Sequence, residues 1–154
     1  LGRCQRSMKI AVVSGGFDPI HSGHIDYISE AKENADYLIV ALNSDHWLSQ
    51  KKGKPFMEFS ERKQILESIK YVDEVIDFDD TDGSCIGALE KIKNIYPDTD
   101  ITFCNGGDRS EDNIPEKDVK GIKFMFGVGG TNKKNSSSWI LKNWQYHSKG
   151  DKNE

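Results

Sequence analysis

Short apolar runs alternate with amphipathic stretches along this chain. Continuous apolar runs, typical of strands that are covered on both faces of a sheet, occupy residues 10–13 and 37–42. Three further short runs predict strands at 74–77, 101–104 and 123–126. Between these runs, apolar residues recur three and four positions apart, as they do on one face of a helix. The alternation predicts an α/β fold in which helices cover a parallel, doubly wound sheet of five strands.

Capping residues mark the starts of four predicted helices. The first begins at Ser22 and the second has Ser60 as its N-cap, because serine side chains accept hydrogen bonds from first-turn N–H groups. The third follows Ser84 and is closed by Pro97. The last begins at the serines 136–138. Its expected apolar side chains are Trp139, Ile140 and Trp144.

The predicted strands and helices form a single domain over residues 8–146. Met8 resembles a native start, so residues 1–7 are expected to be disordered or added by cloning. Residues 147–154 are polar and are expected to fray.

The turn between the first strand and the first helix is the most distinctive stretch of the sequence. It reads Gly15-Gly16-Phe17-Asp18-Pro19-Ile20-His21-Ser22-Gly23-His24. A strand followed by a glycine turn and a helix start presents backbone N–H groups and the positive end of a helix dipole, which together favour phosphate. His21 and His24 add hydrogen-bond donors that can become cationic. Two histidines in a loop are usually only solvated, but this context favours a functional pair.

These residues resemble the Gly-Phe-Asp-x-x-His-x-Gly-His signature of the cytidylyltransferase-like nucleotidyltransferases. That family includes the glycerol-3-phosphate and phosphocholine cytidylyltransferases and the heptose-phosphate adenylyltransferases. The resemblance implies a catalytic role for His21 and His24, which would bind phosphate oxygens and stabilise transition-state charge. The same nucleotide site would include Gly15, Gly16, Phe17 and Asp18. Asp18 has two interpretations: a structural cap of the turn, or a residue that orients a histidine or a metal.

A basic stretch follows the second predicted strand. Residues 50–55 contain Lys51, Lys52 and Lys54 around a glycine, and on composition alone they predict a solvated turn. With the helix that follows, this stretch resembles the basic loop of glycerol-3-phosphate cytidylyltransferase. The resemblance implies that the lysines close over the triphosphate or the acceptor phosphate, with Lys51 in catalysis. It places Arg62 at the acceptor phosphate as well.

Two more segments are expected at the same edge of the Rossmann-like sheet, because the carboxyl ends of parallel strands share one crevice. Gly106, Gly107 and Asp108 follow the fourth predicted strand, and Asp108 is expected to contact ribose or Mg²⁺. The serines at 136–138 resemble the Ser-Thr-Thr-x-Ile element of the family and would bind the β- and γ-phosphates. Simple helix capping is the alternative, but it needs only one serine.

Two branches of the family remain open as the source of the activity. The basic stretch favours a cytidylyltransferase that moves CMP from CTP to a phosphorylated alcohol such as glycerol 3-phosphate and releases pyrophosphate. The Gly-Gly-Asp turn and the lack of an arginine-led element resemble the heptose-phosphate branch, which would use ATP and a sugar phosphate. We expect CTP rather than ATP, with Mg²⁺ accompanying the nucleotide, and the resemblance implies a homodimer. A catalytically idle nucleotide-binding regulator is the non-enzymatic alternative.

Composition narrows the remaining classes. The 154 residues carry a net charge of −4, so nucleic acid is not an expected partner. No apolar run approaches the roughly 20 residues of a membrane span, and three cysteines without framework spacing favour reduced thiols in the cytoplasm. No Gly-x-Gly-x-x-Gly follows the first strand, which argues against a dehydrogenase. The sequence shows no cluster of side chains with metal-ligand spacing.

Overall fold

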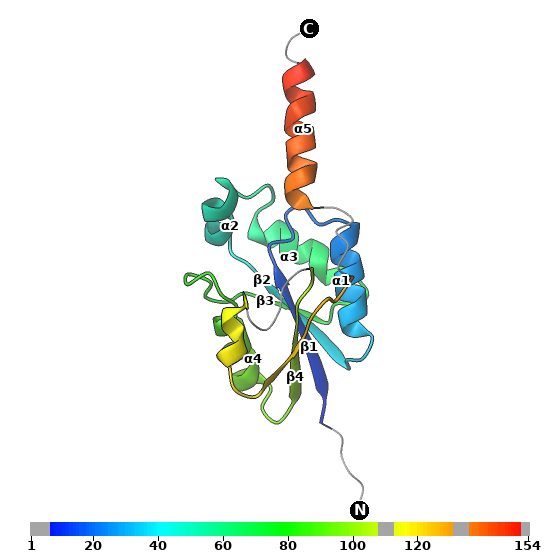
Figure 1. Ribbon diagram of the computed structural model, residues 1–154, viewed down its shortest axis with the longest axis vertical. Helices are drawn as coiled ribbons and strands as arrows, with labels where there is room; N and C mark the ends of the chain where they lie inside the picture. The colour runs from blue at the N-terminus through cyan, green and yellow to red at the C-terminus, as the bar shows by residue number, and fades with distance from the viewer. Residues whose placement is uncertain (1–6, 108–112, 131–135, 152–154) are drawn as a thin grey trace, which may run out of the picture.

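Five parallel strands form the central sheet of the computed structural model, which describes residues 7–107, 113–130 and 136–151. In space the strands follow the order β3-β2-β1-β4-β5. The α/β fold with a five-stranded, doubly wound sheet is therefore as predicted (Figure 1). The strands are β1 (Lys9–Gly15), β2 (Tyr37–Leu42), β3 (Glu74–Ile76), β4 (Asp100–Cys104) and β5 (Ile122–Met125).

Helices cover both faces of this sheet. On one face, Ile28 and Leu66 pack into a core cluster with Val13 of β1. On the other face, Leu89 packs with Val12, the neighbouring residue of the same strand. Successive strand residues point to opposite faces, so a strand covered on both sides needs a continuous apolar run. The helices are α1 (Ser22–Lys32), α2 (Asp45–Lys52), α3 (Phe59–Glu67), α4 (Ile86–Ile95), the 3₁₀ helix η2 (Pro115–Asp118) and α5 (Ser137–Asp151).

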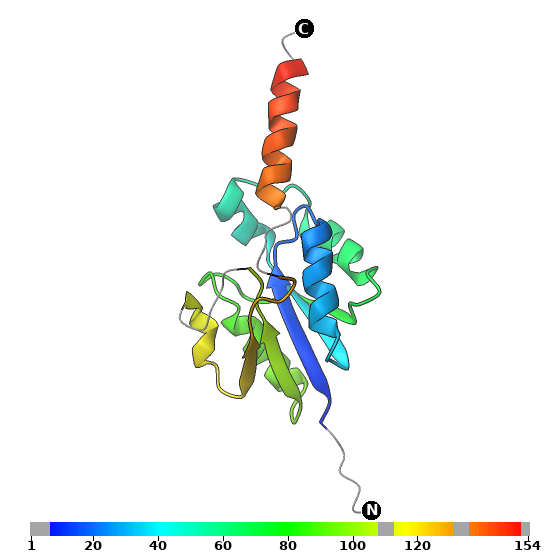
Figure 2. The ribbon, with the colours of Figure 1, turned by 45° about the vertical axis from the view of Figure 1, so that its right-hand side comes forward.

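The chain reverses its direction across the sheet beside β1. From β1 it moves outward through β2 to β3, and it then returns to the other side of β1 as β4. A crevice opens at such a switch point, outside the carboxyl ends of the strands. Helices α1 and α3 lie on one side of the sheet and α4 on the other, while α5 projects away beyond this edge (Figures 1 and 2).

Helix α2 corrects the first half of the turn predicted at residues 50–55, because residues 50–52 are helical and only residues 53–55 lie outside the helix. The helix begins after Ser44, whose Oγ accepts the N–H of Trp47 at 3.1 Å, and it continues to Lys52. Only Leu48 of this helix is buried. A helix with one buried residue has almost no apolar periodicity, which is why the sequence pattern did not reveal it.

Three other helix ends differ from the prediction. Helix α3 has Glu58 rather than Ser60 at its N-cap, and the N-cap of α4 is Cys85 rather than Ser84. Helix α5 continues to Asp151, so residues 147–151 are helical instead of frayed. Alternative capping residues one or two positions apart shift such boundaries easily.

The apolar face expected for the last helix is largely exposed. Trp139 and Trp144 keep 49% and 65% of their surface exposed. None of the helices in the described ranges is both long and apolar enough to cross a membrane.

Candidate active site

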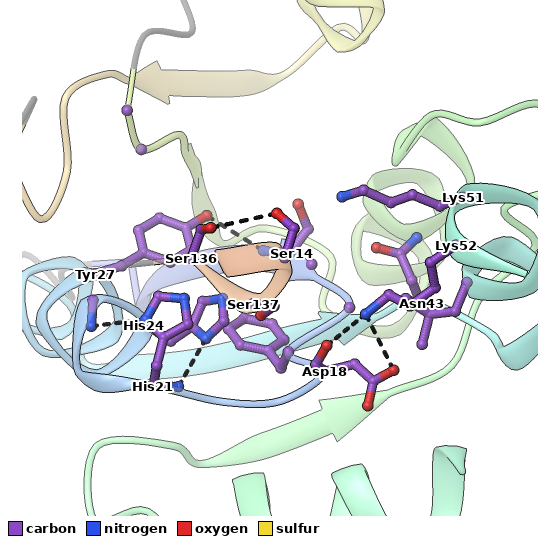
Figure 3. Close-up of a pocket in the computed structure, with 18 of the residues that line it drawn as sticks. Ser14, Asp18, His21, His24, Tyr27, Asn43, Lys51, Lys52, Ser136 and Ser137 are labelled. Atoms are coloured by element: carbon purple, nitrogen blue, oxygen red, sulfur yellow. Dashed lines mark hydrogen bonds and ion pairs between the residues drawn. The ribbon is translucent and has the colours of Figure 1, made fainter. Parts of the chain in front are cut away.

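A cavity of about 1160 Å³ opens at the carboxyl edge of the sheet, where the first turns of α1 and α5 meet the end of α2 (Figure 3). Its lining brings together the turn after β1, the glycines after β4 and the serines before α5. The predicted convergence of three distant segments on one crevice is confirmed. The lining includes these predicted residues: Gly15, Gly16, Phe17, Asp18, His21, His24, Lys51, Lys52, Lys54, Gly106, Gly107, Ser136, Ser137 and Ser138. Asp108 lies outside the described residues.

His21 and His24 form the N-terminal cap of α1, where the sequence predicted Ser22. The Nδ1 atom of His21 accepts the N–H of Gly23 at 3.1 Å, and Nδ1 of His24 accepts the N–H of His21 at 3.2 Å. The two rings stack with their centroids 3.8 Å apart. Since each Nδ1 is an acceptor, each neutral ring carries its proton on Nε2. The cap therefore fixes the tautomer and the direction of both histidines.

The local environment keeps His24 neutral. Burial, together with the positive charges of His21 and Lys51, lowers the pKa of His24 to about 3. The ring also lies against Phe17, with centroids 4.8 Å apart. At neutral pH His24 is consequently a neutral Nε2–H donor rather than the cation that the sequence allowed.

The turn that carries these histidines is held in an uncommon backbone conformation. Phe17 is buried and has φ of 50°, in the left-handed region that a bulky residue rarely adopts. Strained positions of this kind persist only where surrounding contacts enforce them. Here burial of the ring and its contact with His24 supply those contacts.

Asp18 anchors the chain that follows α2. Its side chain is fully buried, and its two oxygens accept the N–H groups of Phe56 at 2.6 Å and Met57 at 2.7 Å. Lys52 donates to the Asp18 carbonyl oxygen at 2.5 Å and pairs with the carboxylate at 3.4 Å (Figure 3). Of the two interpretations of Asp18, this geometry supports the structural one. The same contacts hold the Lys52 ammonium against Asp18 at the cavity.

Lys51 lies one residue earlier, in the last turn of α2. Its ammonium is 4.9 Å from the ring centroid of Trp47, within the range of a cation–π contact. Lys51 and Lys54 both line the cavity. The basic stretch is thus a helix end followed by a short segment, and all three of its lysines line the cavity.

Arg62 corrects a prediction, because it is a buried structural residue and does not line the cavity. Its guanidinium is 0% exposed and donates to the carbonyl oxygens of Gly16 at 3.0 Å and Asn43 at 2.8 Å. It also donates to the Met57 carbonyl oxygen at 2.9 Å and to the Asp45 carboxylate at 2.7 Å. Most of its donors are used inside the protein, so Arg62 joins three segments of the cavity wall instead of binding a substrate phosphate.

Asp80 is a buried carboxylate beside the start of α2. Its carboxylate accepts hydrogen bonds from the Asn43 amide at 3.1 Å and from the backbone and side chain of Ser44, both at 2.8 Å. Asp80 is 5% exposed. It therefore fixes the start of α2, and through α2 the position of the lysines.

Tyr27 is a cavity residue that sequence reasoning missed. Its hydroxyl donates to the Cys104 carbonyl oxygen at 2.5 Å and accepts the Ser14 N–H at 3.4 Å. It thereby joins α1 to the ends of β1 and β4. Its position one helical turn after His24 was the available signal, because residues three apart share a helix face.

Close packing against Tyr27 explains one glycine of the site. Gly129 has φ of 83°, and a Cβ placed there would lie 2.9 Å from the Tyr27 Cα atom. Gly129 also donates its N–H to the Glu30 carboxylate. Glycine is therefore required here for close approach of the β5–α5 segment to α1.

The serines at the start of α5 divide between capping and contacts across the cavity. Ser136 Oγ accepts the Trp139 N–H at 3.0 Å, which is ordinary helix capping. Ser137 donates to the Pro19 carbonyl oxygen at 2.7 Å and so links the start of α5 to the turn after β1. Two helix N-termini, those of α1 and α5, consequently meet at one cavity.

The amino-acid sequence was compared with family models and with known proteins, and both comparisons found similar sequences. A family model described as "Cytidylyltransferase-like" matches residues 12–148. The chain is 46% identical over 69 residues to "Glycerol-3-phosphate cytidylyltransferase" of Bacillus subtilis (strain 168), covering 45% of this chain and 54% of that protein. It is 32% identical over 138 residues to "Bifunctional protein HldE" of Yersinia enterocolitica, covering 83% of this chain and 27% of that protein. The chain thus spans about half the length of the first relative.

A solved structure supports the fold. The lipopolysaccharide core biosynthesis protein from Thermoplasma volcanium GSS1 matches with a TM-score of 0.58 at 24% identity. The match covers 77% of this chain and 95% of that one. At this level of identity the likeness shows a shared fold alone.

Proposed function

Because this chain belongs to the cytidylyltransferase-like family, we propose that it moves CMP from CTP to a small phosphorylated alcohol such as glycerol 3-phosphate, releasing pyrophosphate. The observation that carries this choice is the 46% identity to a protein named glycerol-3-phosphate cytidylyltransferase, against 32% to the protein named HldE. The three lysines that line the cavity support a phosphorylated acceptor.

The proposed reaction is an in-line displacement at the α-phosphorus. An oxygen of the acceptor phosphate forms the new P–O bond, and the bond from the α-phosphorus to the pyrophosphate oxygen breaks. The nucleophile is already an anion, so no general base is needed. The obstacle is the crowding of negative charge, and positioning with electrostatic stabilisation are the means of overcoming it.

The histidine pair supplies donors for this charge. The Nε2–H groups of His21 and His24 are fixed by the cap of α1, beside the positive end of its dipole. Since the low pKa of His24 keeps its ring neutral, its donor does not depend on a proton gained near pH 7. Fixed donors cost little reorganisation as charge develops in the transition state.

The start of α5 and the lysines would bind the phosphate groups of the two substrates. Residues 136–138 begin α5, and first-turn N–H groups without intrahelical partners suit the β- and γ-phosphates. Lys51 and Lys54 would contact the acceptor phosphate or the triphosphate, while Lys52 is held by Asp18.

Mg²⁺ is proposed to accompany the nucleotide and to neutralise part of its phosphate charge. Within the described ranges, no three His, Cys, Asp or Glu side chains gather as a metal site. In nucleotide sites, phosphate oxygens and water supply most of the Mg²⁺ ligands, so the proposed ion would be held chiefly by the nucleotide.

Adenylyl transfer from ATP to a sugar phosphate is the second candidate. It is favoured by the HldE match, which covers 83% of this chain against 45% for the cytidylyltransferase match. A catalytically idle regulator is disfavoured, because the histidine cap, the lysines and the α5 start all line one cavity.

A homodimer is also proposed. The support within the structure is the projecting helix α5, on which Trp139 and Trp144 remain largely exposed. Light scattering coupled to gel filtration would give a mass of twice 17.4 kDa if the proposal is right.

A screen of nucleotides against acceptors tests the proposed activity. CTP, UTP, ATP and GTP would each be combined with glycerol 3-phosphate and with sugar phosphates, and pyrophosphate release would be recorded. We expect release with CTP and a phosphorylated alcohol. Release only with ATP and a sugar phosphate would replace the cytidylyl proposal, and no release with any pair would favour the regulator. A protein with both histidines replaced by alanine is the control.

A further inference from the structure

Glu116 of η2 has an unsatisfied carboxylate oxygen beside the cavity. The residue is 2% exposed and lines the cavity. Its Oε2 accepts the Cys85 N–H at 2.8 Å, at the start of α4. Its Oε1 is buried and has no hydrogen-bond partner within the described part of the chain. Buried acceptors are nearly always paired and are costly when they are not, so a partner from a bound molecule is expected.

The position of Glu116 indicates which part of a nucleotide it meets. Glu116 belongs to the segment between β4 and β5, and its hydrogen bond to Cys85, the N-cap residue of α4, places it beside that helix. Lys51 and Lys52 lie in the last turn of α2, and His21 and His24 cap α1. A carboxylate repels phosphate, so the phosphates belong with the lysines and helix N-termini. The uncharged nucleoside is left for the side of Glu116.

We propose that Glu116 Oε1 accepts a hydrogen bond from the nucleoside of the bound nucleotide and thereby selects that nucleotide. The inference rests on the proposed nucleotidyltransferase function and names a specificity residue for it. A carboxylate accepts and never donates, which favours a base edge with an amino group, such as N4 of cytosine. Uracil places a carbonyl oxygen at that position, which the carboxylate repels. A ribose hydroxyl offers the same donor chemistry, and the test separates the two sources.

Replacing Glu116 by glutamine converts the acceptor into a donor. In Glu116→Gln the amide oxygen must accept the Cys85 N–H, because the amide nitrogen can only donate. The amide NH₂ then occupies the place of Oε1. We expect the preference for CTP over UTP, measured as a ratio of dissociation constants by calorimetry, to fall by about 10- to 100-fold. Binding of inorganic tripolyphosphate, which has no nucleoside, should stay unchanged.

Two further nucleotide pairs identify the donor. If 2′-deoxy-CTP or 3′-deoxy-CTP is penalised in the natural protein and the penalty disappears in Glu116→Gln, the donor is the ribose hydroxyl. ATP against ITP, which has an oxygen in place of the amino group, repeats the base comparison for an adenylyl enzyme. If the CTP proposal is wrong, the protein would bind ATP and not CTP. The effect of Glu116 would then be measured as the ratio of the dissociation constants of ATP and ITP.

Asp118→Asn is the matched control, since it removes one carboxylate from an exposed position of the same 3₁₀ helix. It should leave every ratio unchanged. Equal affinities of Glu116→Gln and the natural protein for all nucleotides would overturn the inference, as would an equal loss for nucleotides and tripolyphosphate. If Glu116→Gln does not fold, the nucleotide affinities of the natural protein test the inference. Equal affinities within every pair, CTP and UTP, ATP and ITP, and CTP and its deoxy forms, would also overturn the inference.

Discussion

Replacement of Arg62 by methionine tests whether this arginine supports the cavity wall or binds substrate. Methionine keeps much of the side-chain length without a charge. It would leave the carbonyl oxygens of Gly16, Asn43 and Met57 without their donors. At about 1 kcal/mol for each of the three acceptors, the lower end of the usual cost of an unsatisfied buried group, the loss of unfolding free energy should be about 3 kcal/mol. The Asp45 side chain is 42% exposed and can return to water, so it adds little.

Thermal and denaturant unfolding measure this loss directly. For a domain of this size, a loss of that order lowers the melting temperature by roughly 6–12 °C. Lys63→Met, at the next position of α3, removes a positive charge that is not buried and should change the stability by less than about 1 kcal/mol. A stable Arg62→Met protein whose only defect is a raised KM for the acceptor would refute the structural assignment and restore the phosphate-binding role.

Three further predictions concern the cavity. His21→Ala and His24→Ala should each lower kcat by about 10²- to 10³-fold, as for loss of one fixed donor, with an unchanged circular dichroism spectrum; full activity of either variant would remove that histidine from the mechanism. The folded-state pKa of His24, about 3 against 6.5 unfolded, means that the unfolded chain takes up the proton first. Stability from this residue is therefore complete above pH 6.5 and falls by up to about 1.4 kcal/mol per pH unit down to about pH 3, a slope that urea titrations should show to be smaller in His24→Gln. Replacing Lys51, Lys52 and Lys54 together by alanine should raise KM for at least one substrate in steady-state kinetics; unchanged KM values would mean that these lysines are only solvated.

The fold was predictable because its signals are local. A strand buried on both faces must be apolar throughout, so β1 and β2 could be read directly from the sequence. The functional turn after β1 could also be predicted from the sequence, because glycines and histidines at fixed spacing before a helix have few purely structural explanations. The gathering of the cavity segments followed from the rule that parallel strands end at one edge.

The side-chain roles that were missed depend on partners far away in the sequence. A charged residue on a helix is expected to be exposed, and nothing near Arg62 shows that its acceptors come from residues 16 and 43. Asp18 meets the chain at Phe56, and Glu116 meets it at Cys85, 31 residues earlier. Such pairs form only after the sheet has brought their segments together, so no local pattern records them.

The central claim, displacement at the α-phosphorus of CTP, is tested most directly by following labelled phosphorus. The protein would be incubated with glycerol 3-phosphate and CTP labelled in either the α- or the γ-phosphate, and the products would be separated by chromatography. The account predicts that the α label appears in a cytidine-diphospho conjugate of the acceptor and the γ label in pyrophosphate. Transfer of the γ label to the acceptor, or recovery of the α label only in unchanged CTP, would contradict it.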